Sequence, residues 1–568
     1  MNNGPLSSTL LAQRLIDMGC LLPYQIDELQ ARQVLTNTPL DVLLRESRLV
    51  SDNVLTTTLS TLSGIAIVSL GRYTIAPELV HRLSPVEAYT AHTLPVEYRD
   101  GIITLVTDVI PADRATGEFA ALFQSAVEWK LCTEDELRKA HIHFYGLGAE
   151  SIDILVAETA DPAEETPQTV SVAATSVNSG MVRFIHQLIA EAIRMNATDI
   201  HIEPFDNALR LRYRIDGMLQ NIPLPKNISR IRRAIASTIK IMANLDIAER
   251  RKPHDGRIKV RFGATEYDLR VSVLPTNRGE SLNLRILNSH AEIIRLENLG
   301  ISENLIASVR GLTDIPHGVI LLTGPTGSGK TTTLYALLSR ISTIEKKIIT
   351  VEDPIEYEIG GINQIQVHPK IDLTFASALR SILRHDPDVI LIGEIRDPET
   401  AEIAVRAAQT GHLVFSTLHT NDAPSAITRL MDMRIEPYLI SSSLEGVIAQ
   451  RLIRKVCAVC QRPMELPAEF AAEISRTYPD EMASAVIREG AGCPACNYAG
   501  YHGRCAITEV MPLTSTIRAM IIARQPANLI KQAAVAEGML TLRQDGWLRV
   551  LRGQTTLAEI LRVTGITE

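Results

Sequence analysis

The chain has 568 residues, of which 45% are hydrophobic and 21% are charged, and its formal net charge is −8. This length exceeds what a single hydrophobic core supports, and the composition is that of a globular protein of ~3–4 domains. The negative charge argues against a protein built chiefly to coat nucleic acid. The chain shows neither a secretory signal pattern nor an apolar run near the ~20 residues that cross a bilayer, so we expect a cytosolic protein.

The region before residue 181 predicts two small subdomains and a linker. Apolar residues recur at helical spacing through residues 1–70, which indicates a helical subdomain. Residues 71–157 predict an α/β part, because two strand patterns flank the turn signal Asp100-Gly101. Residues 158–180 lose aromatic residues and fill with Ala, Thr, Ser, Pro and Glu, which is typical of a mobile linker.

Residues 181–288 predict a further α/β domain that is rich in arginine. Alternating apolar and basic residues indicate half-exposed strands, among them 257–261 and 267–273. Arginines occupy the polar positions of these strands. Two more, Arg232 and Arg233, fall on a predicted helix, where the simplest interpretation is a solvated basic face.

The run from Gly318 to Leu334 carries the most specific motif of the chain. An apolar strand pattern is followed by a loop that fits G-x-x-x-x-G-K-[ST] and then by a helix pattern. Glycines let backbone N–H groups converge on a polyphosphate, Lys330 would reach the β- and γ-phosphates, and the Thr331 hydroxyl would ligate Mg²⁺. A plain glycine-rich turn is the alternative. The expected nucleotide-binding residues are Gly324, Pro325, Thr326, Gly327, Ser328, Gly329, Lys330, Thr331 and Thr332.

Acids and histidines follow apolar strand patterns after this loop. Glu394 ends one strand, at the place where such enzymes hold the carboxylate for Mg²⁺ and the attacking water. Since Gly393 replaces the Asp that usually precedes it, either Glu394 serves alone or Glu356, from a neighbouring strand end, assists. Solvated turns are the alternative for both acids. His412 and His419 flank the next strand and are either structural or sense the γ-phosphate.

Four of the seven cysteines form two C-x-x-C pairs, Cys457 with Cys460 and Cys493 with Cys496. Four thiolates in tetrahedral array are typical of a structural Zn²⁺ site, because they leave no open position for catalysis. The alternative is four unrelated reduced thiols, which the long separation of the two pairs leaves open.

In chain order, these motifs resemble the secretion ATPase superfamily, whose hexamers drive type II secretion or type IV pilus assembly. The resemblance covers roughly residues 180–568. It implies an α/β multidomain fold, with a PAS-like domain at 181–288 and a P-loop, RecA-like ATPase domain at 289–568. The tetracysteine insert at about 455–505 and the long N-terminal docking region are similar to the secretion and pilus-extension members. The segments that carry the resemblance run from Ala197-Thr-Asp-Ile-His-Ile-Glu-Pro204 through Gly324–Thr331 and Ile392-Gly-Glu-Ile-Arg-Asp397 to Gly500-Tyr-His-Gly-Arg504 and Glu509.

The resemblance implies roles for the matching positions. These are water orientation for Glu394, assistance with Mg²⁺ or water for Glu356, and a histidine box for His412 and His419. Arg257 and Arg270 would reach the γ-phosphate across a domain or subunit boundary, which suits guanidinium chemistry. Closure of the domains would then couple hydrolysis to movement.

The implied protein is a cytoplasmic homohexamer at the inner face of the inner membrane that uses ATP, Mg²⁺ and structural Zn²⁺. Its partners would be an inner-membrane platform protein and a cytoplasmic adaptor, with no nucleic acid. Some members bind cyclic di-GMP through an Arg-Leu-Gly-rich motif, but Gln13-Arg-Leu-Ile and Thr38-Pro-Leu-Asp lack its glycines, so that site is not expected. Two alternatives stay open: a nucleic-acid translocase of the hexameric P-loop class, and a ring scaffold that binds ATP with little turnover.

Overall fold

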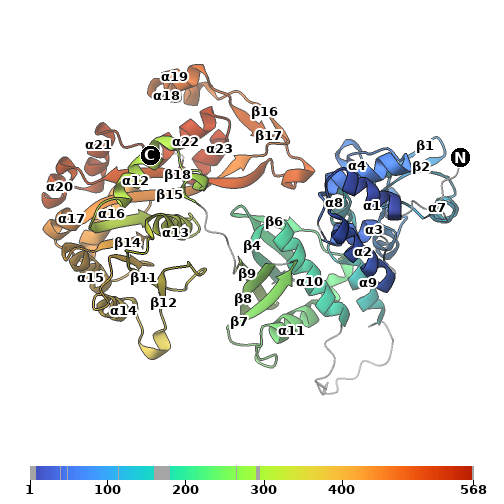
Figure 1. Cartoon of the computed structure of the whole chain (residues 1–568), viewed down its shortest axis with the longest axis horizontal. Coiled ribbons are helices and arrows are strands. Elements are labelled where there is room, and N and C mark those ends of the chain that lie inside the picture. The colour runs from blue at the N-terminus through green and yellow to red at the C-terminus, as the bar shows by residue number, and fades with distance from the viewer. Residues whose placement is uncertain are drawn as a thin grey trace. The chain divides into compact units, whose positions relative to one another are not determined.

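The computed structural model describes residues 8–565, apart from 37, 39, 48, 113, 159–178, 207, 264 and 289–294. The chain forms two compact units, Met1–Phe262 with Asp268–Ile286 and Gly263–Tyr267 with Leu287–Glu568 (Figure 1). The predicted linker at 158–180 lies almost entirely outside the described residues. Among the described helices, none is both long enough and apolar enough to cross a membrane. The finer domain boundaries stay predictions.

The first unit begins with four helices, whose leucines pack into one core that includes Leu15, Leu43 and Leu59. A three-stranded sheet of order β1-β2-β3 follows, and the predicted hairpin turn at Asp100-Gly101 has positive φ at both residues. The elements are α1 (Ser8–Asp17), α2 (Pro23–Thr36), α3 (Leu40–Ser47), α4 (Asp52–Ser63), α5 (Pro77–Val80), α6 (Pro85–Thr90), β1 (Thr93–Arg99), β2 (Ile102–Thr107), α7 (Ala115–Phe123), β3 (Ala126–Leu131), α8 (Glu134–Tyr145) and α9 (Ala149–Glu158).

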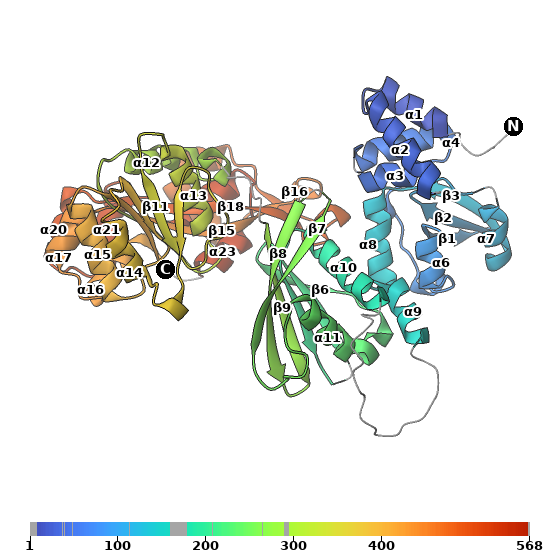
Figure 2. The ribbon, with the colours of Figure 1, turned by 60° about the horizontal axis from the view of Figure 1, so that its bottom comes forward.

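The arginine-rich, PAS-like domain of the first unit is a six-stranded sheet of order β6-β5-β4-β9-β8-β7. Helices α10 and α11 cover one face of it (Figure 2), and Tyr213 Oη donates to the carbonyl oxygen of Leu188 in α10 (2.7 Å). The sequence predicted residues 279–288 as part of this domain without singling them out as a strand, and the structure shows that they form β9. The elements are α10 (Ser179–Arg194), β4 (Ala197–Pro204), β5 (Leu209–Ile215), β6 (Met218–Ile222), α11 (Arg232–Met242), β7 (His254–Phe262), β8 (Thr265–Thr276) and β9 (Gly279–Asn288).

The second unit is built on a seven-stranded sheet of order β12-β11-β13-β14-β10-β15-β18, in which β15 and β18 are the antiparallel pair. Its central strands are buried along their length and mostly apolar, as is typical of a parallel sheet with helices on both faces. The elements up to the insert are α12 (Glu303–Thr313), β10 (Gly318–Thr323), α13 (Lys330–Ile341), β11 (Ile348–Glu352), β12 (Asn363–Gln366), α14 (Phe375–Ile382), β13 (Val389–Ile392), α15 (Pro398–Gln409), β14 (Leu413–Leu418), α16 (Ala423–Asp432), α17 (Pro437–Ser443) and β15 (Leu444–Val456).

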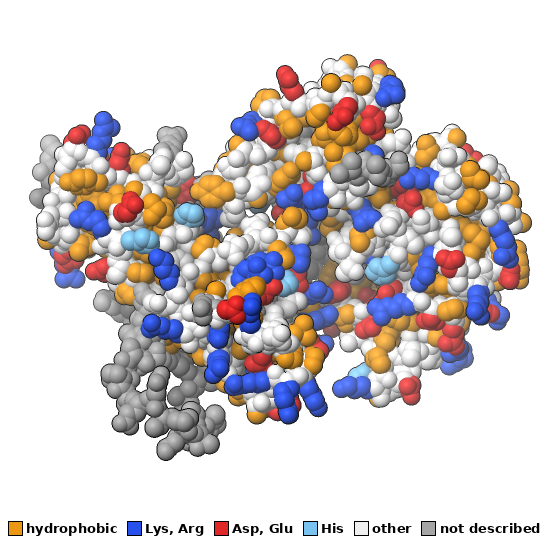
Figure 3. All heavy atoms as spheres, turned by 180° about the vertical axis from the view of Figure 1, so that it is seen from behind, with side chains coloured by type: hydrophobic (Ala, Val, Ile, Leu, Met, Phe, Trp, Pro, Cys, Tyr) orange, Lys and Arg blue, Asp and Glu red, His pale blue; other side chains and the backbone are white. Residues whose placement is uncertain are grey.

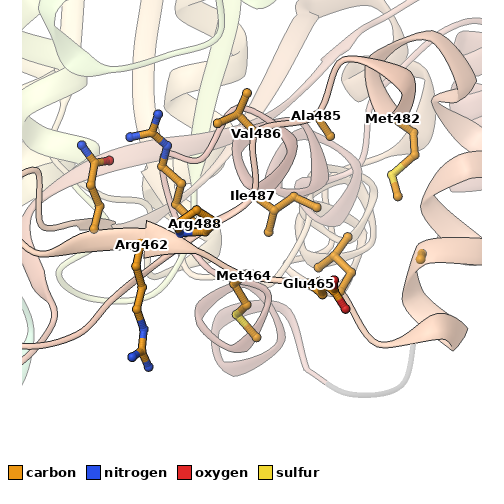
Figure 4. A pocket seen from close by; sticks show the side chains of 12 residues that line it. Arg462, Met464, Glu465, Met482, Ala485, Val486, Ile487 and Arg488 are labelled. Atoms are coloured by element: carbon orange, nitrogen blue, oxygen red, sulfur yellow. The ribbon is translucent and has the colours of Figure 1, made fainter.

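The cysteine-bearing insert lies between β15 and β18 (Tyr501–Pro512). A groove of about 690 Å³ runs between its strands and helices, and Met464, Met482 and Ile487 are among the side chains that line it (Figure 4). The insert contains β16 (Gln461–Pro463), α18 (Ala468–Thr477), α19 (Pro479–Ala483) and β17 (Arg488–Gly490), and the chain ends with α20 (Ser515–Ile522), α21 (Ala527–Ala536), α22 (Leu542–Leu551) and α23 (Leu557–Thr564).

Candidate active site

The glycine loop joins the last residue of β10 to the first residue of α13. Gly324, Gly327 and Gly329 have φ of 145°, 78° and 87°, which only glycine adopts without strain. A Cβ on Gly324 would lie 2.4 Å from the carbonyl oxygen of Gln450. Ser328 is buried, and its Oγ has no hydrogen-bond partner among the described residues. A buried, unpaired hydroxyl within a glycine loop fits the oxygen of a polyphosphate.

Lys330 lies over this loop. Its Nζ donates to the carbonyl oxygens of Gly324 (2.7 Å) and Pro325 (3.1 Å). Burial lowers the pKa of Lys330 to about 8, although the nearby Glu394 carboxylate acts in the opposite sense. An anion bound at the loop would favour the charged ammonium and raise this pKa again, so the side chain is suited to a phosphate ligand.

Gln450 on β15 fixes the loop from the neighbouring strand. Its Nε2 donates to the carbonyl oxygen of Ser328 (2.8 Å), and Thr333 Oγ1 donates to its Oε1 (2.8 Å). The side chain is 2% exposed. Sequence reasoning missed this residue, because its partners lie 122 and 117 positions away. The one available signal was a glutamine at the end of an apolar run, Val447-Ile-Ala449.

Glu394 directly follows Gly393 beyond β13, and only β14 separates β13 from β10. Its carboxylate is 13% exposed, forms an ion pair with Arg396, and lies 3.4 Å from Nε2 of His419. A Cβ at Gly393 would lie 3.3 Å from the Cα of Glu352, so a side chain at this position would be in close contact with β11. Glu394 is thus a restrained acid at the loop-bearing edge of the sheet.

Glu352 and Tyr335 form a buried network between β11 and α13. Glu352 accepts hydrogen bonds from Tyr335 Oη, Thr350 Oγ1 (2.6 Å) and Gln364 Nε2 (3.2 Å). Because these donors occupy both of its oxygens, Glu352 is a structural carboxylate. Glu356 is exposed instead, and its backbone N–H donates to Tyr335 Oη (3.4 Å). The segment that carries Glu356 is therefore tied to the helix that begins at the glycine loop.

The two predicted histidines lie at opposite ends of β14. His419 follows the carboxyl end of the strand, next to Glu394. His412 precedes the other end, where its Nδ1 lies 2.8 Å from the carbonyl oxygen of Ala407 and 3.1 Å from Thr410 Oγ1. A strand rises ~3.3 Å per residue, so about 20 Å separates the histidines. The structure brings His419 to the loop-bearing edge and leaves His412 away from it.

Arg257 and Arg270 belong to the first unit, whereas the glycine loop belongs to the second. Arg257 is exposed on β7, next to the buried Ile258. Arg270 lies between the buried Leu269 and Val271 on β8, so it projects from the face of the sheet opposite α11. The Nε of Arg270 has no hydrogen-bond partner among the described residues. Both guanidinium groups are therefore placed on the polar face of their sheet.

The four cysteines of the insert converge where β15 ends and β18 begins. The Sγ–Sγ distances are 3.9 Å for Cys457 and Cys493, 3.8 Å for Cys460 and Cys496, and 3.7 Å for Cys493 and Cys496. Four Zn–S bonds of ~2.3 Å at tetrahedral angles place the sulfurs ~3.8 Å apart. Backbone N–H groups donate to two of the sulfurs at 3.3 Å, which favours thiolates. The residues fit a structural Zn²⁺ and are not four unrelated thiols.

Replacing Cys493 by Ser is expected to reduce bound zinc from about one ion to well under one per chain. The unfolding temperature of the second unit should fall by ~5 °C or more, because the ion contributes directly to folding. Elemental analysis and differential scanning calorimetry measure the two effects. Cys20→Ser, at a half-buried cysteine outside the cluster, is the matched control. Full zinc content in Cys493→Ser protein would contradict the assignment.

Glu509 on β18 caps two helices at once. Its Oε1 accepts the N–H of Ala423 at the start of α16 (2.8 Å), and its Oε2 accepts the N–H of Leu542 at the start of α22 (3.3 Å). The side chain is 1% exposed, and this burial raises the pKa of Glu509 to about 7 against the effect of the two N–H donors. Glu509 therefore holds α16 and α22 to the sheet.

This buried acid predicts a pH dependence. Between pH 4.5 and about 7, Glu509 is ionised in the unfolded chain but protonated in the folded one. The contribution of Glu509 to the stability of the second unit should therefore be complete below pH 4.5, fall through this window by at most ~3 kcal/mol, and change no further above it. Glu509→Gln should flatten that part of the profile of unfolding temperature against pH, whereas Glu469→Gln, at an exposed site on α18, should not. An unchanged Glu509→Gln profile would contradict the prediction.

At the carboxyl edge of a parallel sheet, an anion-binding loop and an acid two strands away define the RecA-like class of P-loop ATPases. The sequence model of the family described as "Type II/IV secretion system protein" matches residues 175–562. The chain belongs to this family, and it is an ATP hydrolase.

Known proteins agree with this assignment. The chain is 38% identical over 565 residues to the type IV pilus assembly ATPase PilB of Myxococcus xanthus, and the aligned region covers 98% of each chain. It is 47% identical over 401 residues to the type II secretion system protein HxcR of Pseudomonas aeruginosa, covering 71% of this chain and 81% of that one. The X-ray structure of the ATPase DotB of Yersinia pseudotuberculosis matches at a TM-score of 0.50 and 19% identity, over 72% of this chain and 100% of that one, and supports the fold alone.

Proposed function

We propose that this chain is the hexameric cytoplasmic ATPase that powers assembly of a type IV pilus or of a type II secretion pseudopilus. It would act at the inner face of the inner membrane on a platform protein. Relatives named for both machines support this proposal, one of them along 98% of both chains. In the N-terminal region, α2 exposes Val34 and Leu35 (84% and 85%), which supports docking to the platform or to a cytoplasmic adaptor.

In the proposed reaction, ATP lies on the glycine loop with its β- and γ-phosphates at Lys330. Water attacks the γ-phosphorus, the bond to the β–γ bridging oxygen breaks, and ADP and phosphate leave. Glu394 accepts a hydrogen bond from the water and orients it, while Arg396 and His419 hold the carboxylate. The Thr331 hydroxyl and Glu356 would hold Mg²⁺, which supplies charge neutralisation at the phosphates when bound.

Arg257 and Arg270 would complete the site by reaching the γ-phosphate across a domain or subunit boundary. The unpaired Nε of Arg270 and the exposure of Arg257 support this assignment. A guanidinium stabilises the charge that spreads over the transferred group. Hydrolysis would then depend on the movement that brings the arginines in, which is the proposed coupling of chemistry to force. The role of His412 in a histidine box stays a prediction.

The observation that carries the proposal is the position of Glu394, fixed beside the loop that holds Lys330. The test is the ATPase activity of the full-length chain, measured across a size-exclusion profile with and without the cytoplasmic part of a platform protein. Activity should elute with the hexamer and rise with the platform fragment. Lys330→Ala should lower it ~100-fold or more, because the triphosphate loses its main positive contact.

Lys346→Ala is the matched control, because this lysine is exposed in the same unit. It should leave turnover within about twofold of the wild type, as expected for an exposed site. Activity that survives in Lys330→Ala protein would contradict the assigned site. Stimulation by DNA or RNA with a steep salt dependence would instead support a nucleic-acid translocase.

A further inference from the structure

A hollow of about 520 Å³ lies at one end of the six-stranded sheet in the PAS-like domain. Residues of β4, β5, β8, β9 and α11 line it, together with the turn between β8 and β9 and the segment that follows α11, and all belong to the first unit. Neither Arg257 nor Arg270 is among them. The apolar lining residues include Ile202, Leu209 and Leu282. The hollow is therefore distinct from the polar face that carries Arg270.

Positive charge dominates the lining of this hollow. Its two carboxylates are already paired, since Asp206 lies 2.6 Å from Arg278 and Glu280 forms an ion pair with the buried Lys240. Arg278 is one of four arginines in the lining. The other three form no ion pair in the part of the chain that the structure describes. Lys and Arg side chains are numerous on the face of the molecule that Figure 3 shows. The four arginines that line the hollow are Arg232, Arg233, Arg250 and Arg278.

The start of α11 adds to this positive charge. Arg232 and Arg233 are its first two residues, its first turn holds no acid, and Ile231 at the N-cap provides no side-chain hydrogen bond. Two cations at the positive end of a helix dipole are electrostatically unfavourable. Arg232 Nη1 donates to the carbonyl oxygens of Phe205 (3.0 Å) and Asp206 (3.1 Å), which fixes the guanidinium without neutralising it. A bound anion would offset the repulsion between the two arginines and the helix dipole. Unfavourable local interactions of this kind concentrate at functional sites.

We propose that the hollow binds a small phosphate-bearing molecule, at a site separate from the glycine loop. Planar guanidinium groups bind phosphate oxygens through paired hydrogen bonds, and three unneutralised arginines match the charge of a phosphate ester or diphosphate. The apolar lining would contact the organic part of the molecule, and the volume suits one of nucleotide size. The phosphate belongs either to a soluble metabolite or to a phospholipid headgroup, which share this chemistry.

The test uses full-length Lys330→Ala protein, so that the glycine loop contributes little, and titrates it with inorganic pyrophosphate in a calorimeter without Mg²⁺. Introducing both Arg233→Ala and Arg250→Ala into the Lys330→Ala protein should weaken pyrophosphate binding ~10-fold or more, because the loss of one charged contact weakens binding by about that factor. The charge-matched control adds Arg230→Ala and Arg251→Ala, at neighbouring arginines that do not line the hollow. This control should weaken binding less than about twofold.

If both pairs of substitutions weakened pyrophosphate binding equally, the binding would depend on diffuse positive charge and the proposal would be overturned. Unchanged binding in both variants would also overturn it. Circular dichroism of all variants checks that the fold is retained. A second arm sediments the same proteins with phosphatidylcholine vesicles that contain phosphatidylglycerol. Loss of sedimentation in the Arg233→Ala, Arg250→Ala protein alone assigns the phosphate to a lipid headgroup. If both variants sediment equally and only the Arg233→Ala, Arg250→Ala protein loses pyrophosphate binding, the phosphate belongs to a soluble molecule.

Discussion

Replacing Glu394 by Gln is expected to lower ATP turnover by ~10²–10⁴-fold while leaving ATP binding nearly unchanged. The amide keeps the shape of the side chain but does not carry the negative charge that holds the attacking water. In the native chain, the carboxylate of Glu394 forms an ion pair with Arg396 and lies close to His419, so its negative charge is part of the site. Turnover is measured as phosphate release from the assembled protein, and binding with a fluorescent nucleotide.

Glu402→Gln is the matched control for this variant. Glu402 is exposed on α15 and pairs with Arg406 on the same helix, so its loss should change turnover by less than about twofold. Equal turnover in wild type and Glu394→Gln protein would contradict the assigned role and would support a ring scaffold that binds ATP without consuming it.

The second large effect is expected from the arginines of the first unit. Arg257→Ala and Arg270→Ala should each lower turnover ~10³-fold, since an arginine that stabilises the transferred phosphoryl group contributes a factor of this order. ATP binding should change far less, because the glycine loop and Lys330 are untouched. Turnover is measured on the hexamer fraction, which separates a chemical defect from an assembly defect.

Arg261→Ala provides the control, because Arg261 is exposed on β7 in the same alternation as Arg257. Its turnover should stay within about twofold of the wild type, as for other exposed arginines. Normal turnover in assembled Arg257→Ala and Arg270→Ala proteins would remove the proposed link between hydrolysis and domain movement, whatever the outcome at Glu394.

Features with local signals could be predicted from the sequence. The glycine loop follows from residues that must adopt positive φ, and the start of α15 follows from Asp397, whose side chain accepts the N–H of Thr400 (2.8 Å). The hairpin at Asp100-Gly101 and the spacing within each C-x-x-C motif are of the same kind. In each case the determining residues are a few positions apart, so spacing alone carries the information.

Features that depend on distant segments could not be predicted. Gln450 contacts a loop 122 residues earlier, and Glu509 caps a helix 86 residues earlier. The crowding at Gly393 depends on β11, which reaches it only in the folded sheet. Arg232 is half-buried and Arg233 is exposed, in agreement with the predicted solvated helix face, but the hollow that they line also needs residues of β4, β5 and β9, which are distant in the sequence.

One strand joins the two ligand sites of the second unit. β15 is hydrogen-bonded to β10 near the glycine loop, holds the loop through Gln450, and continues to within one residue of Cys457. Along this length it pairs with β18, which returns from the cysteines to Glu509. Because hydrogen bonds to both neighbours brace this strand, we expect a tilt of β15 at the glycine loop to be carried to the cysteines rather than absorbed by bending. The glycine loop and the cysteine cluster are therefore attached to one continuous strand rather than to separately hinged segments.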